Sequence, residues 1–78
     1  MKVQAYVLIQ VSGEKVKQAV DKIARTPGVI KTELVTGNYD VVALTEGADL
    51  KALGETVISK IRCIEGVSHT SSLVVVPT

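Results

Sequence analysis

The chain has 78 residues, of which 46% are hydrophobic, and a formal net charge of +1. A chain of this length buries only about 60% of the surface that its unfolded form exposes, so its core alone gives marginal stability. One cysteine and one histidine exclude an internal disulfide and a zinc site built from these residue types. We therefore expect one domain, residues 1–78, that gains stability by forming homo-oligomers.

The distribution of charge argues against nucleic-acid and membrane partners. Lysine and arginine are spread along the whole chain, whereas nucleic-acid-binding proteins usually concentrate basic charge on one face. No segment approaches the roughly 18 continuous apolar residues of a transmembrane helix, and the N-terminus lacks the apolar run of a signal peptide. We expect a soluble cytoplasmic protein, and a lone thiol fits that reducing compartment.

The first third of the sequence predicts a strand and then a helix. Residues 3–11 read VQAYVLIQV, in which one alternate row is wholly aliphatic and the other is mixed. Ser12 is a candidate cap for the helix, with Glu14 in its first turn. Thr26-Pro27-Gly28 ends this helix. Its apolar stripe consists of Val16, Ala19, Val20, Ile23 and Ala24.

Two β-branched runs, residues 29–36 and 39–45, predict a hairpin. Gly37-Asn38 lies between them, and Gly at the first position of a two-residue connection is typical of a type II′ turn with positive φ. Asp40 then stands near the start of a strand that otherwise reads Val, Val, Ala, Leu. A carboxylate there is costly unless it is exposed or has a hydrogen-bonding partner. The stretch is therefore either an ordinary polar hairpin tip or a binding site.

The rest of the chain predicts a second helix and a fourth strand. Asp49 is a candidate N-cap, and Gly54 weakens the helix by about 1 kcal/mol relative to Ala. Glu65-Gly66 ends the helix, residues 67–76 form the last strand and Pro77 stops it. The buried stripe of this helix consists of Leu50, Leu53, Val57, Ile61 and Ile64.

An internal repeat supports the order β-α-β-β-α-β. KIARTPGVIKT at residues 22–32 aligns with KIRCIEGVSHT at residues 60–70, at an offset of 38. Two βαβ units of equal length are what a ferredoxin-like fold requires. We therefore predict an α+β fold in which a four-stranded antiparallel sheet has two helices on one face.

The other face of this sheet is expected to be apolar. Side chains alternate along a strand, and both alternate rows of residues 67–76 contain aliphatic groups as well as hydroxyls. The first strand turns outward either Tyr6 and Leu8 or its wholly aliphatic row. Such a face is larger than monomers normally expose. We expect two copies to pack sheet against sheet as a dimeric α+β barrel.

Few residues are suited to catalysis. His69 lies in a predicted strand between Ser68 and Thr70, which is more typical of a surface or interface position than of a general base. Cys63 lies near a helix end, where packing is its ordinary role. The glycines are isolated at the ends of elements and form no phosphate-binding loop. We expect no catalytic residues, no metal site and no cofactor.

Two stretches resemble the effector-binding half of the Lrp/AsnC (feast/famine) regulators, the RAM module. VTGNYDVVALTE at residues 35–46 is similar to the Gly-x-Tyr-Asp hairpin of the family. IEGVSHTSSLVVVP at residues 64–77 is similar to its last strand, which opens with Gly-Val and passes through hydroxyl residues into an aliphatic run. The resemblance covers essentially the whole chain and shares the element order predicted above.

The resemblance implies a homodimer with facing sheets that assembles further into an octamer or decamer. It also implies that an amino acid or similar small metabolite binds in clefts at subunit interfaces. Asp40 could accept a hydrogen bond from the ligand ammonium, and backbone N–H groups near Gly37 with a hydroxyl could meet its carboxylate. The ligand-binding positions would be Gly37, Asn38, Tyr39, Asp40, Thr70 and Ser72.

A complete regulator of this family has a helix-turn-helix domain ahead of this module, whereas the first predicted strand here begins at Val3. We therefore expect a free-standing amino-acid-sensing and oligomerisation module without its own DNA-binding domain. It would act alone or in assemblies with full-length Lrp/AsnC regulators.

Two other functions share the predicted fold. A small cofactor-free monooxygenase of the dimeric α+β-barrel group would hold its substrate in a cavity between sheet and helices, with His69 pointing into it. An ACT-like regulatory module would bind an amino acid near Ser12-Gly13 and associate side by side. The cavity and the dimer geometry distinguish these alternatives.

Overall fold

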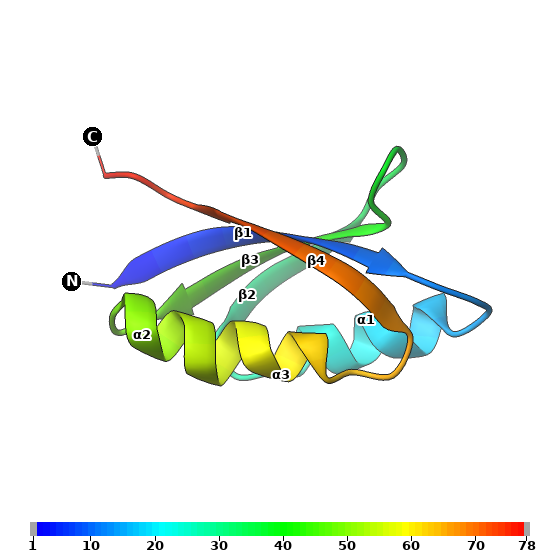
Figure 1. The fold of residues 1–78 in the computed structure, drawn as a ribbon, viewed down its shortest axis with the longest axis horizontal. Coiled ribbons are helices and arrows are strands. Elements are labelled where there is room, and N and C mark those ends of the chain that lie inside the picture. The colour runs from blue at the N-terminus through cyan, green and yellow to red at the C-terminus, as the bar shows by residue number, and fades with distance from the viewer. Residues whose placement is uncertain (1, 78) are drawn as a thin grey trace.

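The computed structural model describes residues 2–77 and has a four-stranded antiparallel sheet with helices on one face (Figure 1). The predicted ferredoxin-like α+β fold is confirmed, because the spatial order of the strands is β2-β3-β1-β4. None of the helices in this part of the chain is long and apolar enough to cross a bilayer. The strands are β1 (Val3–Val11), β2 (Val29–Leu34), β3 (Val41–Gly47) and β4 (Val67–Val74).

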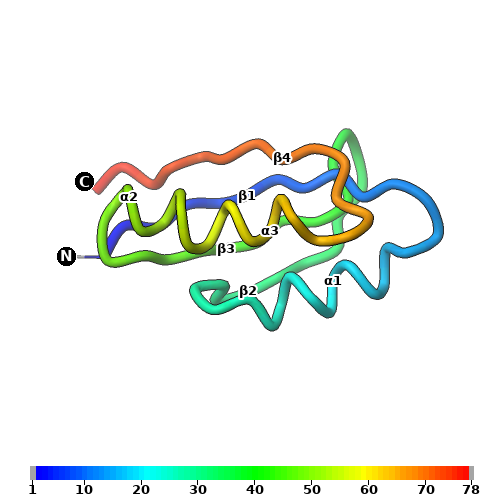
Figure 2. The backbone as a smooth tube through the Cα atoms, turned by 60° about the horizontal axis from the view of Figure 1, so that its bottom comes forward, coloured from blue at the N-terminus to red at the C-terminus, as the bar shows by residue number. Residues whose placement is uncertain are grey.

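Two helical segments connect the strands. The first is α1 (Val16–Ala24), between β1 and β2. The second is continuous and joins β3 to β4 through α2 (Leu50–Ala52), the π-helical η1 (Leu53–Ile58) and α3 (Ser59–Arg62). Figure 2 shows this second segment running along the sheet while α1 lies beside β2. The two segments together cover one face and leave the other without helices.

The core between sheet and helices is aliphatic, as the composition predicts. Alternate residues of β1 and β3 point toward the helices, and they meet the buried stripes of both helical segments. Thr45 is also completely buried in this layer, and its hydroxyl donates a 2.9 Å hydrogen bond to the carbonyl of Ala5. The buried hydrophobic cluster consists of Ala5, Val7, Ile9, Ile23, Val41, Ala43, Leu53, Val57 and Ile61.

The start of α1 differs from the prediction. The helix begins at Val16 with Lys15 at the N-cap and no side-chain cap, so Ser12 does not cap it, and Glu14 is not in its first turn. The backbone N–H of Ser12 instead donates to the carbonyl of Gly66 at 2.8 Å. This tertiary contact holds the loop before α1 against the loop before β4. This is a long-range interaction, which cannot be predicted from the neighbouring residues in the sequence.

The second helical segment begins as predicted but buries one residue fewer. Asp49 is the N-cap, and its carboxylate accepts a 2.7 Å hydrogen bond from the N–H of Ala52. Leu50 is 60% exposed because it faces the aliphatic end of the last strand, beside Val74 and Val76, and not the core. In α1 the predicted stripe is likewise too wide by one residue, since Ala24 is exposed.

The internal repeat is visible in the backbone where each helical segment returns to the sheet. Gly28 and Gly66, 38 positions apart in the sequence, have φ angles of 97° and 98°. The same pair of N–H to carbonyl hydrogen bonds, 3.0 to 3.1 Å long, closes both loops. These bonds run from Thr26 to Ile23 and Val29 to Thr26, and from Ile64 to Ile61 and Val67 to Ile64.

The two loop glycines differ in the space around them, which gives a matched pair of substitutions. A Cβ at Gly28 would lie 2.4 Å from Cγ2 of Val57, whereas the nearest atom at Gly66 is 3.6 Å away. Either alanine would sit at positive φ, at a cost of about 1–2 kcal/mol. Gly28→Ala adds overpacking of about 1–3 kcal/mol. We expect Gly28→Ala to lower the free energy of unfolding more than Gly66→Ala in urea titrations at one protomer concentration. Equal losses would contradict the packing argument.

Candidate functional site

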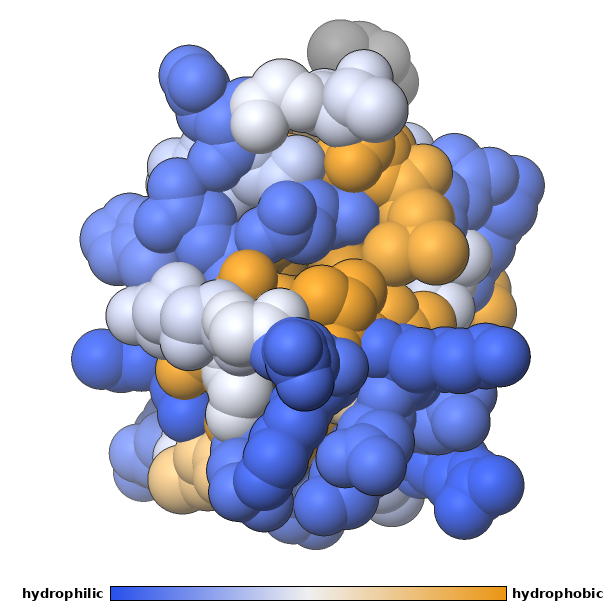
Figure 3. Space-filling view, turned by 90° about the vertical axis from the view of Figure 1, so that its right-hand side faces the viewer, coloured by the Kyte–Doolittle hydropathy of each residue, from blue (hydrophilic) through white to orange (hydrophobic). Residues whose placement is uncertain are grey.

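The face of the sheet without helices, here called the open face, carries large apolar side chains. The strand register places Tyr6 beside Leu44 on β3 and beside Leu73 on β4. These three residues therefore form a continuous apolar row across the middle of the open face. Tyr6 and Leu73 are 45% and 54% exposed. Figure 3 shows hydrophobic groups reaching the surface in the upper part of the molecule, on the sheet side, above a mainly hydrophilic helix side.

The β2–β3 hairpin rises from the sheet on the open-face side, away from the helices (Figure 1). The pairing of Leu34 with Val41 continues in a 2.9 Å hydrogen bond from the N–H of Val35 to the carbonyl of Asp40. This register places Gly37-Asn38 at the apex, and the predicted positive φ of Gly37 is confirmed at 118°. β2 ends at Leu34, two residues before the predicted end at residue 36, and β3 begins at Val41, two residues after the predicted start at residue 39, so the hairpin has a longer projecting tip.

Asp40 fixes the base of this hairpin to the end of β1. Its Oδ2 accepts a 2.8 Å hydrogen bond from the N–H of Val11, and its own N–H donates to the carbonyl of Ile9 at 2.9 Å. The β1–β4 ladder is irregular between Gln10 and Val11, and the Asp40 carboxylate gives the Val11 N–H a partner at this irregularity. The carboxylate near the strand start thus accepts a hydrogen bond from a backbone N–H. This partner offsets the cost of placing a carboxylate at that position.

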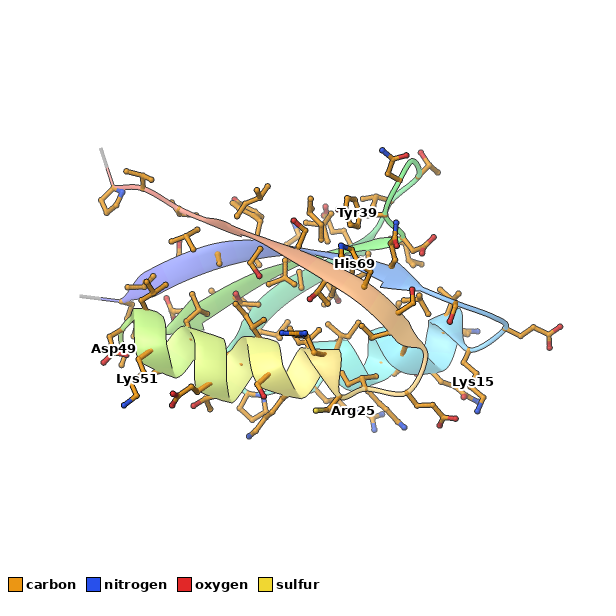
Figure 4. All side chains as sticks on the ribbon, in the orientation of Figure 1. Lys15, Arg25, Tyr39, Asp49, Lys51 and His69 are labelled. Carbon is orange, nitrogen blue, oxygen red and sulfur yellow. The ribbon has the colours of Figure 1, made fainter. Side chains whose placement is uncertain are left out.

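A ring contact joins the hairpin to the last strand. Tyr39 stacks on His69 with ring centroids 6.4 Å apart and an interplanar angle of 23°, within the usual range for aromatic pairs. Figure 4 shows both side chains between the hairpin and β4. Gln10, the cross-strand partner of His69, donates from Nε2 to the carbonyl of Asn38 at 2.7 Å. His69 therefore contacts the hairpin through Tyr39, an interaction that its sequence neighbours do not indicate.

Thr70 and Ser72 lie on the opposite face of β4 from the hairpin. Their cross-strand partners are Ile9 and Val7, whose side chains are in the core, so both hydroxyl residues face the helix layer. They line a groove of about 400 Å³ between β4 and the second helical segment, here called the β4–helix groove. The groove is lined by Ile58, Arg62, Val67, Ser68, His69, Thr70 and Ser72.

The six predicted site residues thus form two groups that do not meet within one chain. Residues 37–40 lie at the hairpin on the open-face side, and Thr70 and Ser72 lie in the β4–helix groove. Within residues 2–77 no group of three or more His, Cys, Asp or Glu could hold a metal ion. The layer between sheet and helices is filled by aliphatic side chains, and the ring of His69 stacks on the hairpin instead of entering that layer.

Comparison with known proteins identifies the family. The family model described as the Lrp/AsnC ligand binding domain matches residues 4–78. The chain belongs to the Lrp/AsnC ligand-binding domain family. Its curated relatives are regulators of transcription, so the family is regulatory, and neither the monooxygenase nor the ACT alternative is favoured.

The curated relatives of this Lrp/AsnC domain are longer proteins. It is 36% identical over 73 residues to an HTH-type transcriptional regulator of Pyrococcus furiosus, covering 90% of this chain and 49% of the regulator. It is 37% identical over 57 residues to the HTH-type transcriptional regulator LysM of Saccharolobus solfataricus, covering 73% of this chain and 39% of LysM. The chain therefore spans about half the length, or less, of these regulators.

Solved structures show the same fold. The protein TTHA0845 of Thermus thermophilus superimposes with a TM-score of 0.88 at 36% identity, covering 97% of this chain and 95% of that one. The transcriptional regulator NMB0573 of Neisseria meningitidis, solved as a complex with L-Met, has a TM-score of 0.84 at 18% identity, covering 96% of this chain and 50% of that one. At that identity the second likeness concerns the fold alone.

The Asp40 anchor is testable at a single amide. Asp40→Ala should leave the Val11 N–H without its partner, which costs about 1–3 kcal/mol locally, while Asp40→Asn keeps an oxygen acceptor. We expect hydrogen exchange at the Val11 amide, followed by NMR, to accelerate in Asp40→Ala and to stay near the parent rate in Asp40→Asn. Asp21→Ala on the exposed side of α1 is the control. Unchanged exchange in Asp40→Ala would refute the anchoring role.

Proposed function

We propose that residues 1–78 form a ligand-binding unit that senses an amino acid or similar small metabolite within transcription-regulating assemblies in the cytoplasm. The observation that carries the proposal is the match to the Lrp/AsnC ligand binding domain over residues 4–78, which includes both the hairpin and the last strand. The amino-acid class is supported by the L-Met complex of a regulator with the same fold.

The separation of the predicted site residues favours a site at a subunit interface. The hairpin tip projects on the open-face side, whereas Thr70 and Ser72 line the β4–helix groove on the other side. A ligand that uses both groups must therefore bridge two chains, with the hairpin of one subunit beside the groove of another. This is the arrangement that the family resemblance implies.

The open face supports a homodimer with facing sheets. A continuous row of Tyr6, Leu44 and Leu73 is a poor surface to leave in water, and a small core independently favours further burial. Assembly of such dimers into an octamer or decamer would bring hairpins and grooves of different dimers together. The output of the module would then pass through partner subunits, including full-length Lrp/AsnC regulators, and not through direct contact with nucleic acid.

The dimer is testable by adding charge to the open face. Tyr6→Glu and Leu73→Glu each place a carboxylate in the proposed interface at a position about half exposed in the protomer. An uncompensated buried charge costs about 3–5 kcal/mol, so the dissociation constant of the dimer should rise by at least about 100-fold. Light scattering should then report monomers, while Gln18→Glu on α1 keeps the assembly. A wild-type monomer at low micromolar concentration, or dimers in both variants, would refute the facing-sheet dimer.

Ligand binding is testable by calorimetric titration of the twenty amino acids into the intact oligomer. If Asp40 meets the ligand ammonium, Asp40→Asn should weaken binding by about 10-fold or more, because it removes the charge but keeps the hydrogen bond to Val11. Asp21→Asn should bind like the parent. An intact oligomer that binds none of the twenty would overturn the sensing function, and full affinity in Asp40→Asn would remove Asp40 from the site.

A further inference from the structure

We propose that the β4–helix groove is the carboxylate-binding half of the ligand site, and that the guanidinium of Arg62 is its anchor. This inference rests on the proposed function, because it assigns one end of the same ligand. It goes further in naming a residue that determines specificity and the chemical group that this residue recognises. Nothing in the hairpin sequence points to Arg62, which lies 22 residues beyond Asp40 in the sequence.

The groove has the composition of an anion site. Arg62 contributes a positive charge, three hydroxyl residues of β4 line the opposite wall, and none of the lining residues within 2–77 carries a carboxylate. Its volume of about 400 Å³ falls in the range of small-molecule pockets, about 300–1,000 Å³. Ile58 and Val67 supply apolar surface beside these polar groups. The groove can therefore bind a small molecule with both a charged and an apolar part.

The cation and two of the hydroxyls are available to a ligand. The ion pairs found within residues 2–77 join Lys2 to Glu46, Lys15 to Glu65 and Lys31 to Glu33, and none includes Arg62. Ser68 already donates its hydroxyl to the carbonyl of Gln10 at 3.1 Å. Thr70 and Ser72, which stand on one face of β4 at a spacing of two, have no side-chain hydrogen bond in this part of the chain.

Arginine and adjacent hydroxyls match the geometry of a carboxylate. The planar guanidinium offers two parallel N–H donors to the two carboxylate oxygens, which a lysine ammonium cannot do. A hydroxyl from Thr70 or Ser72 can donate to a remaining lone pair of the same group. The ligand class is therefore small carboxylates of amino-acid size, and the corresponding amides lack the charge that Arg62 recognises.

A second groove argues for this choice by contrast. It is larger, about 590 Å³, and lies at the opposite end of β1 and β4, next to the start of α2. Its lining is mainly aliphatic, and Lys2 and Gln4 are the polar side chains that the described part of the chain contributes. A zwitterionic amino acid would lose hydration there with few compensating hydrogen bonds. The β4–helix groove is the better match for such a ligand.

The test combines one substitution in the protein with one in the ligand. Each of the twenty amino acids is titrated calorimetrically into the intact oligomer of the parent, Arg62→Gln and Lys60→Gln. Lys60 lies on α3 and is exposed but does not line the groove, so Lys60→Gln controls for loss of charge near the same helix end. Each amino acid that binds is then compared with its α-carboxamide derivative.

We expect Arg62→Gln to weaken amino-acid binding by about 10-fold or more, since charge-assisted hydrogen bonds are worth about 1.5–3 kcal/mol and 1.4 kcal/mol is tenfold. Lys60→Gln should stay within about twofold. The carboxamide should bind the parent and Arg62→Gln equally. Arg62→Lys, which keeps the charge without the planar fork, should recover part of the affinity.

The outcomes separate the two proposals. Suppose that the parent binds an amino acid. The Arg62 assignment is overturned, while the sensing function stands, if Arg62→Gln binds that amino acid as tightly as the parent does. It is also overturned if Arg62→Gln weakens binding of the carboxamide as much as it weakens binding of the amino acid. If the intact parent binds no amino acid, the sensing function fails and the assignment fails with it. If Arg62→Gln does not fold, Arg62→Lys takes its place in the test. The assignment is then overturned if the ratio of amino-acid affinity to carboxamide affinity in Arg62→Lys equals the ratio in the parent.

Discussion

A four-stranded sheet has two faces, and two short helical segments can cover only one of them. Among the described residues the covered face provides a core cluster of aliphatic side chains. The uncovered face has the apolar row of Tyr6, Leu44 and Leu73. The remaining features follow from this asymmetry. The helix layer closes the core, the open face is the surface of the proposed contact with a second copy, and the hairpin and last strand carry the residues of the proposed interface site.

The two halves of the proposed site depend on different physical features. At the hairpin, backbone and side-chain hydrogen bonds from Asp40 and Gln10 to neighbouring segments hold the loop at a fixed angle to the sheet. In the β4–helix groove, strand alternation places Thr70 and Ser72 on the side of β4 that faces the second helical segment, which contributes Arg62. The first half is held by specific bonds, and the second is shaped by the packing of a helix against a strand edge.

Much of the architecture follows from periodicity. Alternation in residues 3–11 and the β-branched runs at residues 29–36 and 39–45 predict strands, although they leave open which row is buried. Asp49 indicates the start of the second helical segment because its capping hydrogen bond is local. Errors occur where a long-range contact decides. Ser12 is not a cap because the loop before α1 is bonded to Gly66. Thr45 lies in the same buried row as Val41 and Ala43, and its hydroxyl finds an acceptor in the carbonyl of Ala5, a partner that the sequence does not identify.

The candidate site shows the same division. The hairpin residues 37–40 are recognisable as a dense polar cluster, and the positive φ of Gly37 follows from its turn position. Alternation shows that Thr70 and Ser72 share one face of β4, but it does not show whether this is the helix side or the open face. The β1–β4 register decides between the two. The contact of His69 with the hairpin and the proposed role of Arg62 are visible only in the assembled sheet and helix, since neither residue belongs to a local motif.

The internal repeat has a consequence for how two copies can stack. Tyr6 and Leu44 are equivalent positions of the two halves and are also direct cross-strand partners, so an approximate twofold axis passes between them through the sheet. Two stacked sheets with such symmetry have two nearly equivalent relative orientations, half a turn apart. The halves differ at their margins, where β2 presents the ion pair of Lys31 and Glu33 and β4 presents uncharged Ser71 and apolar Leu73. Because the β2 margin is charged and the β4 margin is not, the two orientations differ in energy. Two copies can therefore pair in a single orientation although the surface is nearly symmetric.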